Sequence, residues 1–202
     1  MTPDTQALMV DLDAALSTAS NSQYLAILRG VTDLFLAGAA AYRDEHVAVF
    51  DDVMAALIKK LDDAALVELS TRLAPITNAP PNVSSALARH DNIAVSGPLL
   101  KNSSALADPV LAEIAAAKGQ KHLAAIAARG QIGDIVTDVL IDRANADVAR
   151  QVASNTGARL SEIGFVKLIN KAKTDRVLAE AIAKRTDMPP ELEPFLKLTL
   201  VS

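Results

Sequence analysis

Five basic side chains near the carboxyl end of the chain are the residues best suited to binding a charged partner. They are Arg159, Lys167, Lys171, Lys173 and Arg176. Guanidinium and ammonium groups form charge-assisted hydrogen bonds with phosphate and carboxylate oxygens. A groove lined by them predicts an acidic partner, either a protein or a nucleic acid. An ordinary solvated helix surface has a similar composition, so that interpretation stays open.

Helix geometry limits how many of these five side chains can converge. Lys167 and Lys171 are four residues apart and share one helix face. Lys173 diverges from Lys171 by about 200° on a continuous helix, and Arg176 lies beyond a turn. Phe165 is the only aromatic residue nearby that could stack on a base. We therefore expect weak, non-specific DNA binding, and we expect a charge-reversed Lys167/Lys171 double variant to fold normally.

The histidines and carboxylates give no sign of catalysis. His46, His90 and His122 lie on three different expected helices, and the chain has no cysteine. Adjacent acids such as Asp51-Asp52 and Asp62-Asp63 point about 100° apart on a helix, so they do not share a proton as a catalytic pair does. The chain has no nucleophile elbow, phosphate-binding loop or dinucleotide-binding glycine pattern. We expect no metal, no cofactor and no enzymatic activity.

The composition predicts that helices position these residues. Half of the 202 residues are hydrophobic but only 3% are aromatic, and most of the apolar share is Ala, Leu, Val and Ile. Ala and Leu are the best helix formers, and no stretch alternates long enough for a sheet. Residues 1–114 carry 7 Lys and Arg against 14 Asp and Glu, whereas residues 115–202 carry 13 against 10. The acidic first half argues against general nucleic-acid binding.

Apolar spacing of three and four residues predicts four helices in the first part of the chain. Their expected bounds are Asp4–Ala19, Ser22–Tyr42, Asp44–Lys60 and Asp62–Ala74. Ser22, Asp44 and Asp62 are the expected N-caps. The Pro- and Asn-rich segment 75–82 is the best boundary signal, so we divide the chain into an N-terminal bundle, 1–77, and a repeat region, 78–202. No apolar run is long enough for a membrane span, and no secretory signal is evident.

The second part reads as a helical repeat. Acidic helix starts at Asp108, Asp147 and Asp175 are spaced by 39 and 28 residues, and an extra helix from Gln120 to Arg129 accounts for the longer spacing. Asp108 is expected to be an N-cap followed by Pro109 at the first helical position. Pro98 should kink or split its helix. The expected core of this α-solenoid comprises Leu99, Leu100, Val139, Leu140, Leu168 and Ile169.

Several motifs resemble an uncharacterised alphaproteobacterial family, a domain of unknown function with HEAT-like repeats. The resemblance rests on residues 91–103 with 106–108, and on the later segments 135–140, 155–158 and 181–190. It covers roughly residues 60–195 and implies a HEAT-like fold but no activity. Family members are often longer, and the apolar end from Phe195 to Val201 fits a stack that continues.

Together these features predict an all-α protein, an N-terminal helical bundle continuous with a HEAT-like α-solenoid. Solenoids present extended surfaces to partners, so we interpret the chain as a cytoplasmic, non-enzymatic scaffold that binds an unidentified protein. The alternative is a nucleic-acid-binding or DNA-repair-like protein that uses the basic C-terminal face. A regulatory role in bacterial signal transduction is a third hypothesis. The sequence does not define the oligomeric state.

Overall fold

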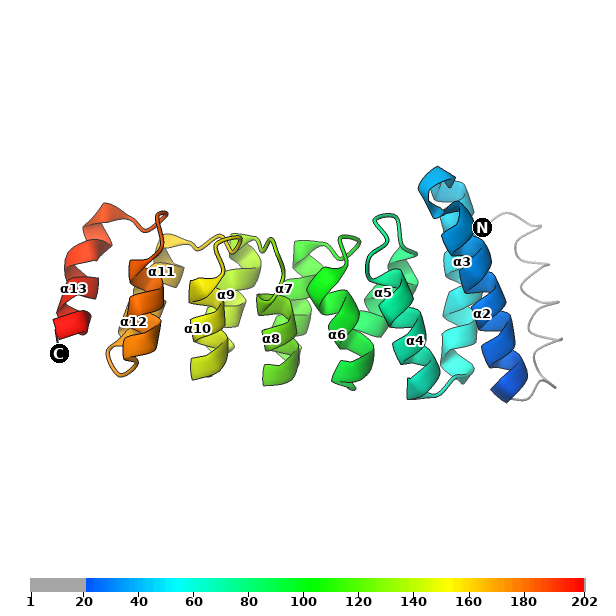
Figure 1. Ribbon diagram of the computed structural model, residues 1–202, viewed down its shortest axis with the longest axis horizontal. Helices are drawn as coiled ribbons and strands as arrows, with labels where there is room; N and C mark the ends of the chain where they lie inside the picture. Colours follow the sequence, from blue (N-terminus) through cyan, green and yellow to red (C-terminus); the bar gives the residue numbers. More distant parts are fainter. Residues whose placement is uncertain (1–20, 202) are drawn as a thin grey trace. The chain divides into compact units, whose positions relative to one another are not determined.

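The computed structural model describes residues 21–201, and this part of the chain is all-α as predicted (Figure 1). Its α-helices are α2 (Asn21–Gly38), α3 (Asp44–Leu57), α4 (Asp63–Leu73), α5 (Pro81–Ala88), α6 (Ile93–Asn102), α7 (Asp108–Ala117), α8 (Gln120–Ala127), α9 (Asp134–Arg143), α10 (Ala146–Ser154), α11 (Glu162–Ala172), α12 (Arg176–Ala183) and α13 (Glu193–Val201). Short 3-10 helices are η1 (Ala39–Ala41), η2 (Ile58–Lys60) and η3 (Pro190–Leu192). Within residues 21–201 the only β-type pairing is one isolated bridge, Ile132 with Ala158. The helix expected over Asp4–Ala19 lies outside the described residues.

The chain folds into two compact units. Unit 1 runs up to Leu99 and includes Ser103–Ala105, and unit 2 comprises Leu100–Asn102 and the residues from Leu106 onward. The segment 75–82, where the sequence suggests a boundary, therefore lies within unit 1. Pro98 lies inside α6, which continues to Asn102, so the helix is not split at the proline.

In unit 1, α3 lies against α2 and α5, and α4 contacts α5. An aromatic cluster fills the space beside α2. Phe35 is fully buried, and its ring centre lies 5.2 Å from that of Phe50 in an edge-on arrangement. The Tyr42 ring stacks on Phe50 at 5.3 Å. Offset and edge-on aromatic pairs add about 0.5–1.5 kcal/mol beyond the burial of their area, so three of the chain's few aromatic residues stabilise this unit.

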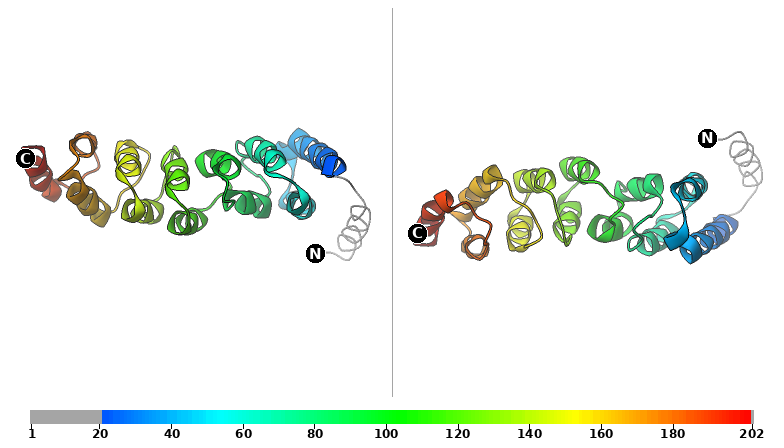
Figure 2. Two further views of the ribbon diagram at one scale, coloured as in Figure 1. Left: turned by 90° about the horizontal axis from the view of Figure 1, so that it is seen from below. Right: turned by 90° about the horizontal axis from the view of Figure 1, so that it is seen from above.

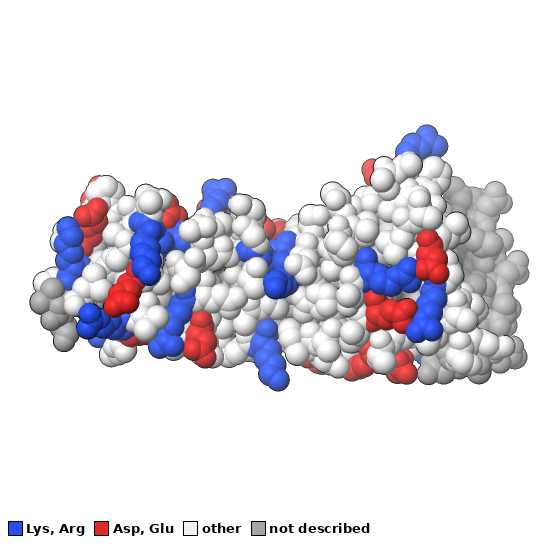
Figure 3. All heavy atoms as spheres, viewed as in Figure 1, with Lys and Arg blue, Asp and Glu red and all other residues white. Residues whose placement is uncertain are grey.

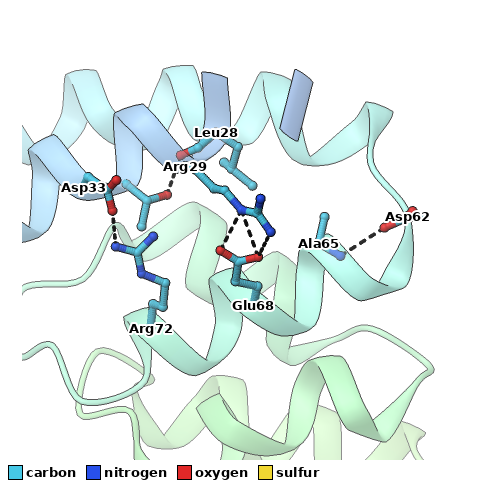
Figure 4. A network of polar contacts seen from close by, with 8 residues as sticks. Leu28, Arg29, Asp33, Asp62, Ala65, Glu68 and Arg72 are labelled. Atoms are coloured by element: carbon cyan, nitrogen blue, oxygen red, sulfur yellow. Dashed lines mark hydrogen bonds and ion pairs between the residues drawn. The ribbon is translucent and has the colours of Figure 1, made fainter. Parts of the chain in front are cut away.

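Two ion pairs join α2 to α4 (Figure 4). Glu68 accepts from Nε of Arg29 at 3.0 Å and from its Nη2 at 2.7 Å. Arg72 of α4 donates to Asp33 of α2. The hydrogen bond from Arg29 lowers the pKa of Glu68, and the same bond raises the pKa of Arg29. Both charged residues within the apolar α2 are thus paired with the neighbouring helix.

Among the described residues, the segment Ser22–Ala41 has the length and composition of a membrane-crossing helix. The segment contains Arg29 and Asp33, so its uncharged runs are each too short to predict a membrane span from the sequence. Apolar core helices of water-soluble proteins share these properties. Leu28 and Phe35 of this segment are buried against the rest of unit 1.

Helix capping in unit 1 agrees only partly with the expected N-caps. Asp62 caps α4, accepting from the backbone N–H of Ala65 at 3.0 Å. Ser22 lies within α2, and Asp44 is the first residue of α3, whose N-cap is Arg43. Asp51, 2% exposed, caps a different helix. Its carboxylate accepts from the first backbone N–H groups of α5 at 2.8 and 2.9 Å, because the N-cap there is a proline with no side-chain acceptor.

Helices α7–α13 of unit 2 form two layers (Figures 1 and 2). In one layer α7, α9, α11 and α13 follow one another, each in contact with the next, and in the other layer α8, α10 and α12 do the same. The buried positions of the second layer are mostly Ala, Val, Leu and Ile. Small side chains allow neighbouring helices to approach closely, which explains why an Ala-rich sequence can bury its core with few aromatic residues.

This arrangement corrects the register of the predicted repeat. The helix starting at Asp108 belongs to the same layer as α9 and α11, and not to the layer of α10 and α12. The segment Gln120–Ala127 is therefore the second helix of a regular pair, not an extra helix. The first helices begin at Asp108, Asp134 and Glu162, so successive pairs are offset by 26 and 28 residues. The register predicted from the sequence was wrong because helices of both layers begin with an acidic residue.

The acidic residues at these helix N-termini differ in their structural roles. Asp175 is the N-cap of α12 and accepts from the backbone N–H of Leu178 at 3.0 Å. Asp108 and Asp147 lie inside the first turns of their helices, where the N-caps are Ala107 and Asn145. A carboxylate in the first turn is still favoured by the helix dipole, so the acidic signal locates a helix start without identifying its cap.

Side chains at the ends of the second-layer helices cap the preceding helix in that layer. Asn155, just after α10, donates to the carbonyls of Ala127 and Arg129 at 2.9 and 2.7 Å. Arg185, just after α12, donates to the carbonyls of Ala153 and Asn155 at 3.3 and 2.9 Å. The last carbonyls of a helix have no partner within it. Each helix pair thus provides hydrogen-bond donors for the free carbonyls at the C-terminal end of a helix in the preceding pair.

The first layer uses the same arrangement. Arg143, at the end of α9, donates to the carbonyls of Ala115 and Lys118 at the end of α7. Lys171, in the last turn of α11, donates to the carbonyl of Ala144 at 3.3 Å. Several cations of unit 2 therefore have a structural role at helix ends.

The predicted core is largely confirmed. Leu99, Leu100, Leu140 and Leu168 are fully buried, and Ile169 is 5% exposed. Val139 is the exception. It is only half-buried, because α9 turns Leu140 and Ile141 toward the interior and leaves Val139 at the side.

Candidate functional site

The five basic residues singled out in the sequence lie on unit 2, and four of them have partners within the chain. Lys167 forms an ion pair with Asp142. Arg159 lies 3.9 Å from Asp134, and Arg176 pairs with Glu180 of its own helix at 3.1 Å. Lys171 caps α9 as described above. Lys173 alone has no side-chain partner among residues 21–201. The complete set is Arg159, Lys167, Lys171, Lys173 and Arg176.

These cations come from four different places, namely the loop before α11, the body of α11, its C-terminal end and the start of α12. On the face seen in Figure 3, basic and acidic side chains of unit 2 alternate and are separated by uncharged surface. No continuous basic strip covers this face. A phosphate backbone is bound by several cations acting together, so the arrangement gives little support to a nucleic-acid site here.

An apolar groove lies beside Lys173, the one of these five cations without a side-chain partner among residues 21–201. One wall is a single stripe of α11 that repeats at i, i+3, i+4 and i+7. The stripe consists of Val166, Ile169, Asn170 and Lys173. Residues with this spacing lie on one face of a helix, and the stripe extends about 10 Å along it at 1.5 Å per residue.

The opposite wall comes from η3 and α13. Its residues are Leu192, Phe195, Leu198 and Thr199, and the groove encloses about 590 Å³. Leu192 and Ile169 are buried in its floor, whereas Phe195 is 59% exposed and Leu198 68% exposed. Two large apolar side chains stand in solvent at the edge of a hollow whose lining is mostly apolar. We refer to this hollow as the α11–α13 groove.

The corresponding positions between α9 and α11 carry polar contacts. A shift of 28 residues places Val166 at the position of Asp138 and Asn170 at the position of Asp142. Asp138 accepts from the Ser161 hydroxyl at 2.6 Å, and Asp142 pairs with Lys167. These contacts hold α11 against α9. Val166 and Asn170 carry no carboxylate, so α11 cannot form the same contacts with the helix that follows it in this layer.

A second, more polar site lies between α10 and α12. Arg150 donates from Nε to Asp175 at 2.8 Å and approaches Asp147 at 3.3 Å. Burial opposes ionisation of Asp175, but hydrogen bonds from the Leu178 backbone and from Arg150 outweigh it and lower the pKa of the carboxyl. A cavity of about 300 Å³ adjoins this pair. The pair of Arg150 with Asp175, together with the hydrogen bond from Leu178, stabilises the start of α12.

The histidines occupy ordinary structural positions. Nδ1 of His46 accepts from the Arg43 backbone at 3.4 Å, and His90 lies 3.7 Å from Asp63. His122 is buried in α8. Across residues 21–201, no group of three or more His, Asp or Glu side chains is placed to hold a metal ion.

Comparison with known proteins places the second half of the chain near a bacterial family. Residues 95–193 match the model of an uncharacterised protein conserved in bacteria (DUF2336). The matched segment resembles a bacterial domain of unknown function, which agrees with the broader part of the resemblance seen in the motifs. It includes α11 and ends at the first residue of α13. Neither the curated proteins nor the solved structures yield a significant match.

Sequence reasoning missed the α11–α13 groove, although part of its signal was present. The segment from Phe195 to Val201 is mostly apolar in the sequence. Val166 was counted only as part of an apolar helix. Its exposure depends on where α13 lies relative to α11, which no local pattern specifies.

Proposed function

We propose that this protein is a non-enzymatic, cytoplasmic interaction module whose α11–α13 groove binds another protein. The observation that carries the proposal is the exposure of Phe195 and Leu198 beside a hollow of about 590 Å³. Large exposed apolar groups that line a hollow mark binding sites more often than plain surface, and aromatic side chains dominate the energetics of interfaces.

The architecture of unit 2 supports the same role. Stacked helix pairs present extended surfaces, and each helix in the stack is held by its neighbours and not by a distant core. The carbonyl caps made by Asn155, Arg143 and Lys171 fix the helices against one another. A rigid wall such as α11 loses little conformational freedom when a partner binds, which favours affinity.

Site-specific photo-crosslinking tests the proposal. A photoreactive phenylalanine analogue at position 195 should form one defined crosslinked product in bacterial cells, identified by mass spectrometry. The same analogue at position 135 is the matched control, because Ile135 is 60% exposed on α9 but lies outside the groove. Equal products from both positions, or none from position 195, would rule out the groove as the binding site.

A further inference from the structure

The walls of the α11–α13 groove define the shape of what it can hold. Val166, Ile169 and Lys173 form a straight stripe about two helical turns long, and Phe195 and Leu198 face it from α13. A groove between two neighbouring helices can bind a third helix. The third helix inserts the apolar residues at its positions i, i+3, i+4 and i+7 into the groove. A small ligand fits less well, because such sites bury most of their ligand and the edge of this one is open to solvent.

The charge of the groove determines the sign of the charge that its partner should carry. Among the described residues, Lys173 is the one charged residue that lines it, and no carboxylate does. Lys173 has no side-chain partner within residues 21–201, unlike Lys167 and Lys171 on the same helix. A long, flexible ammonium side chain next to an apolar floor can pair with a carboxylate on the partner while its methylene groups cover apolar surface. A basic partner would leave two like charges facing each other.

A second copy of this chain does not satisfy these requirements. In a two-fold symmetric interface both copies use the same surface. The same lining would then lie on both sides, and its described residues include no carboxylate that could pair with Lys173 of the other copy.

Building on the proposed function, we infer that the α11–α13 groove binds an acidic amphipathic helix of another protein. The apolar face of that helix contacts Val166, Ile169 and Phe195, and a Glu or Asp at its edge pairs with Lys173. Apolar burial provides the affinity, and the single ion pair selects acidic over basic helices.

Peptide display tests the inference without a known partner. The probe is a phage library of 16-residue peptides with Leu fixed at helical spacing and Glu, Lys, Gln or Ser randomised elsewhere. It is selected on the wild-type protein without prior depletion, so that binding outside the groove remains a possible outcome. Selected peptides should carry a net negative charge with Glu adjacent to the Leu stripe. Selection of neutral or basic peptides, or of none, overturns the inference.

The most enriched peptide, labelled for fluorescence anisotropy, then locates the contacts. Phe195→Ser should weaken its binding by about 30-fold or more, as loss of an interface hot spot does. Lys173→Glu should weaken it by about tenfold, and a peptide with the facing Glu changed to Lys should regain that loss on Lys173→Glu. Ile135→Ser and Lys184→Glu make matched changes at exposed residues outside the groove and should change the Kd by less than about twofold.

The outcomes separate the two proposals. If Phe195→Ser abolishes binding but Lys173→Glu has no effect, the acidic partner is wrong and the groove remains a protein-binding site. If the peptide binds Phe195→Ser as well as wild type, both proposals fail. If the wild-type protein sediments as a dimer that Phe195→Ser dissociates, the occupant is a second copy and the inference is wrong. Circular dichroism should show native helicity in every variant, because Lys173 and Phe195 are exposed.

Discussion

The guanidinium carbon of Arg185 lies 5.6 Å from the centre of the Phe165 ring. The Arg185 side chain is only 4% exposed, and it pairs with Asp187 through both carboxylate oxygens. Its other N–H groups reach the carbonyls of Ala153, Asn155 and Ala158. All five donors are used, so a buried charge is fully compensated while it joins α10, α11 and the end of α12.

Replacing Arg185 should therefore be costly. Arg185→Met removes every one of these hydrogen bonds and leaves helix-end carbonyls unsatisfied, so we expect a loss of about 3–5 kcal/mol in the free energy of unfolding. Urea denaturation measures the loss. The matched control is Arg176→Met, since Arg176 is 82% exposed and its pair with Glu180 is worth under about 1 kcal/mol. Equal stability of the two variants would show that the cap network contributes little.

Leu140 tests the core of unit 2. It is fully buried in α9, so Leu140→Ala should lower the free energy of unfolding by about 2–5 kcal/mol through lost burial and the resulting cavity. Ile135→Ala on the same helix removes an apolar side chain that is 60% exposed and should cost under about 1 kcal/mol, as surface substitutions do. Thermal unfolding should rank the variants in that order. A Leu140→Ala protein as stable as Ile135→Ala would contradict this core assignment.

Asp175 should make stability depend on pH in the acid range. Its pKa is lowered in the folded protein, below the ordinary value of 3.8. A carboxyl with a lowered folded pKa contributes stability that is present above its unfolded pKa and is lost as the pH falls through the folded pKa. Asp175→Asn keeps a capping acceptor but loses the charge that pairs with Arg150.

The stability advantage of wild type over Asp175→Asn should therefore be present at pH 7 and be lost as the pH falls below 3.8 and through the lowered folded pKa of Asp175. Urea titrations at a series of pH values measure it. Asp147→Asn is the control, because Asp147 is 85% exposed and contacts the same Arg150 at 3.3 Å. Its stability difference from wild type should be small at every pH, and a pH dependence equal to that of Asp175→Asn would disprove the role assigned to the Asp175–Arg150 pair.

Duplex DNA should bind weakly at physiological salt. With four of its five candidate cations paired internally, unit 2 should bind a 20-base-pair duplex no more tightly than the roughly micromolar range of non-specific binding. Fluorescence anisotropy at several salt concentrations measures this. Submicromolar binding that Lys167→Glu/Lys171→Glu abolishes would favour the nucleic-acid alternative instead.

The structure changes one expectation for that double variant. The sequence suggested that it folds normally, but Lys171 caps α9 and Lys167 pairs with Asp142. In the double variant, the carboxylate at position 171 lies near the Ala144 carbonyl and the carboxylate at position 167 lies near Asp142. Both contacts then become repulsive. We now expect it to be less stable than wild type by about 1–2 kcal/mol, so its DNA binding must be compared at a temperature where it is folded.

Chelation should leave the protein unchanged. The described histidines and carboxylates form no cluster suited to a metal, so EDTA should not shift the melting temperature. Elemental analysis of protein purified without added metal should find no stoichiometric zinc or iron. A melting temperature that falls with EDTA and recovers with zinc would contradict this expectation.

The sequence by itself determined the helical class and most of the core. Periodic Leu and Ile residues such as Leu140 and Leu168 predict buried helix faces, because spacing of three and four residues places side chains on one side of a helix. Asp62 and Asp175 could be predicted as caps because a carboxylate before a helix accepts its first free N–H groups. These are short-range effects that residues exert within one turn of helix.

Tertiary structure decided which helices share a layer, which cations are free and where the groove lies. Lys171 and Lys173 look alike in the sequence, yet one meets the end of α9 and the other faces open solvent beside Phe195. Asp51 caps a helix that begins 30 residues later. Such outcomes depend on contacts between elements distant in sequence. Local periodicity sets which face of a helix is apolar, but the position of its neighbours sets whether that face is covered.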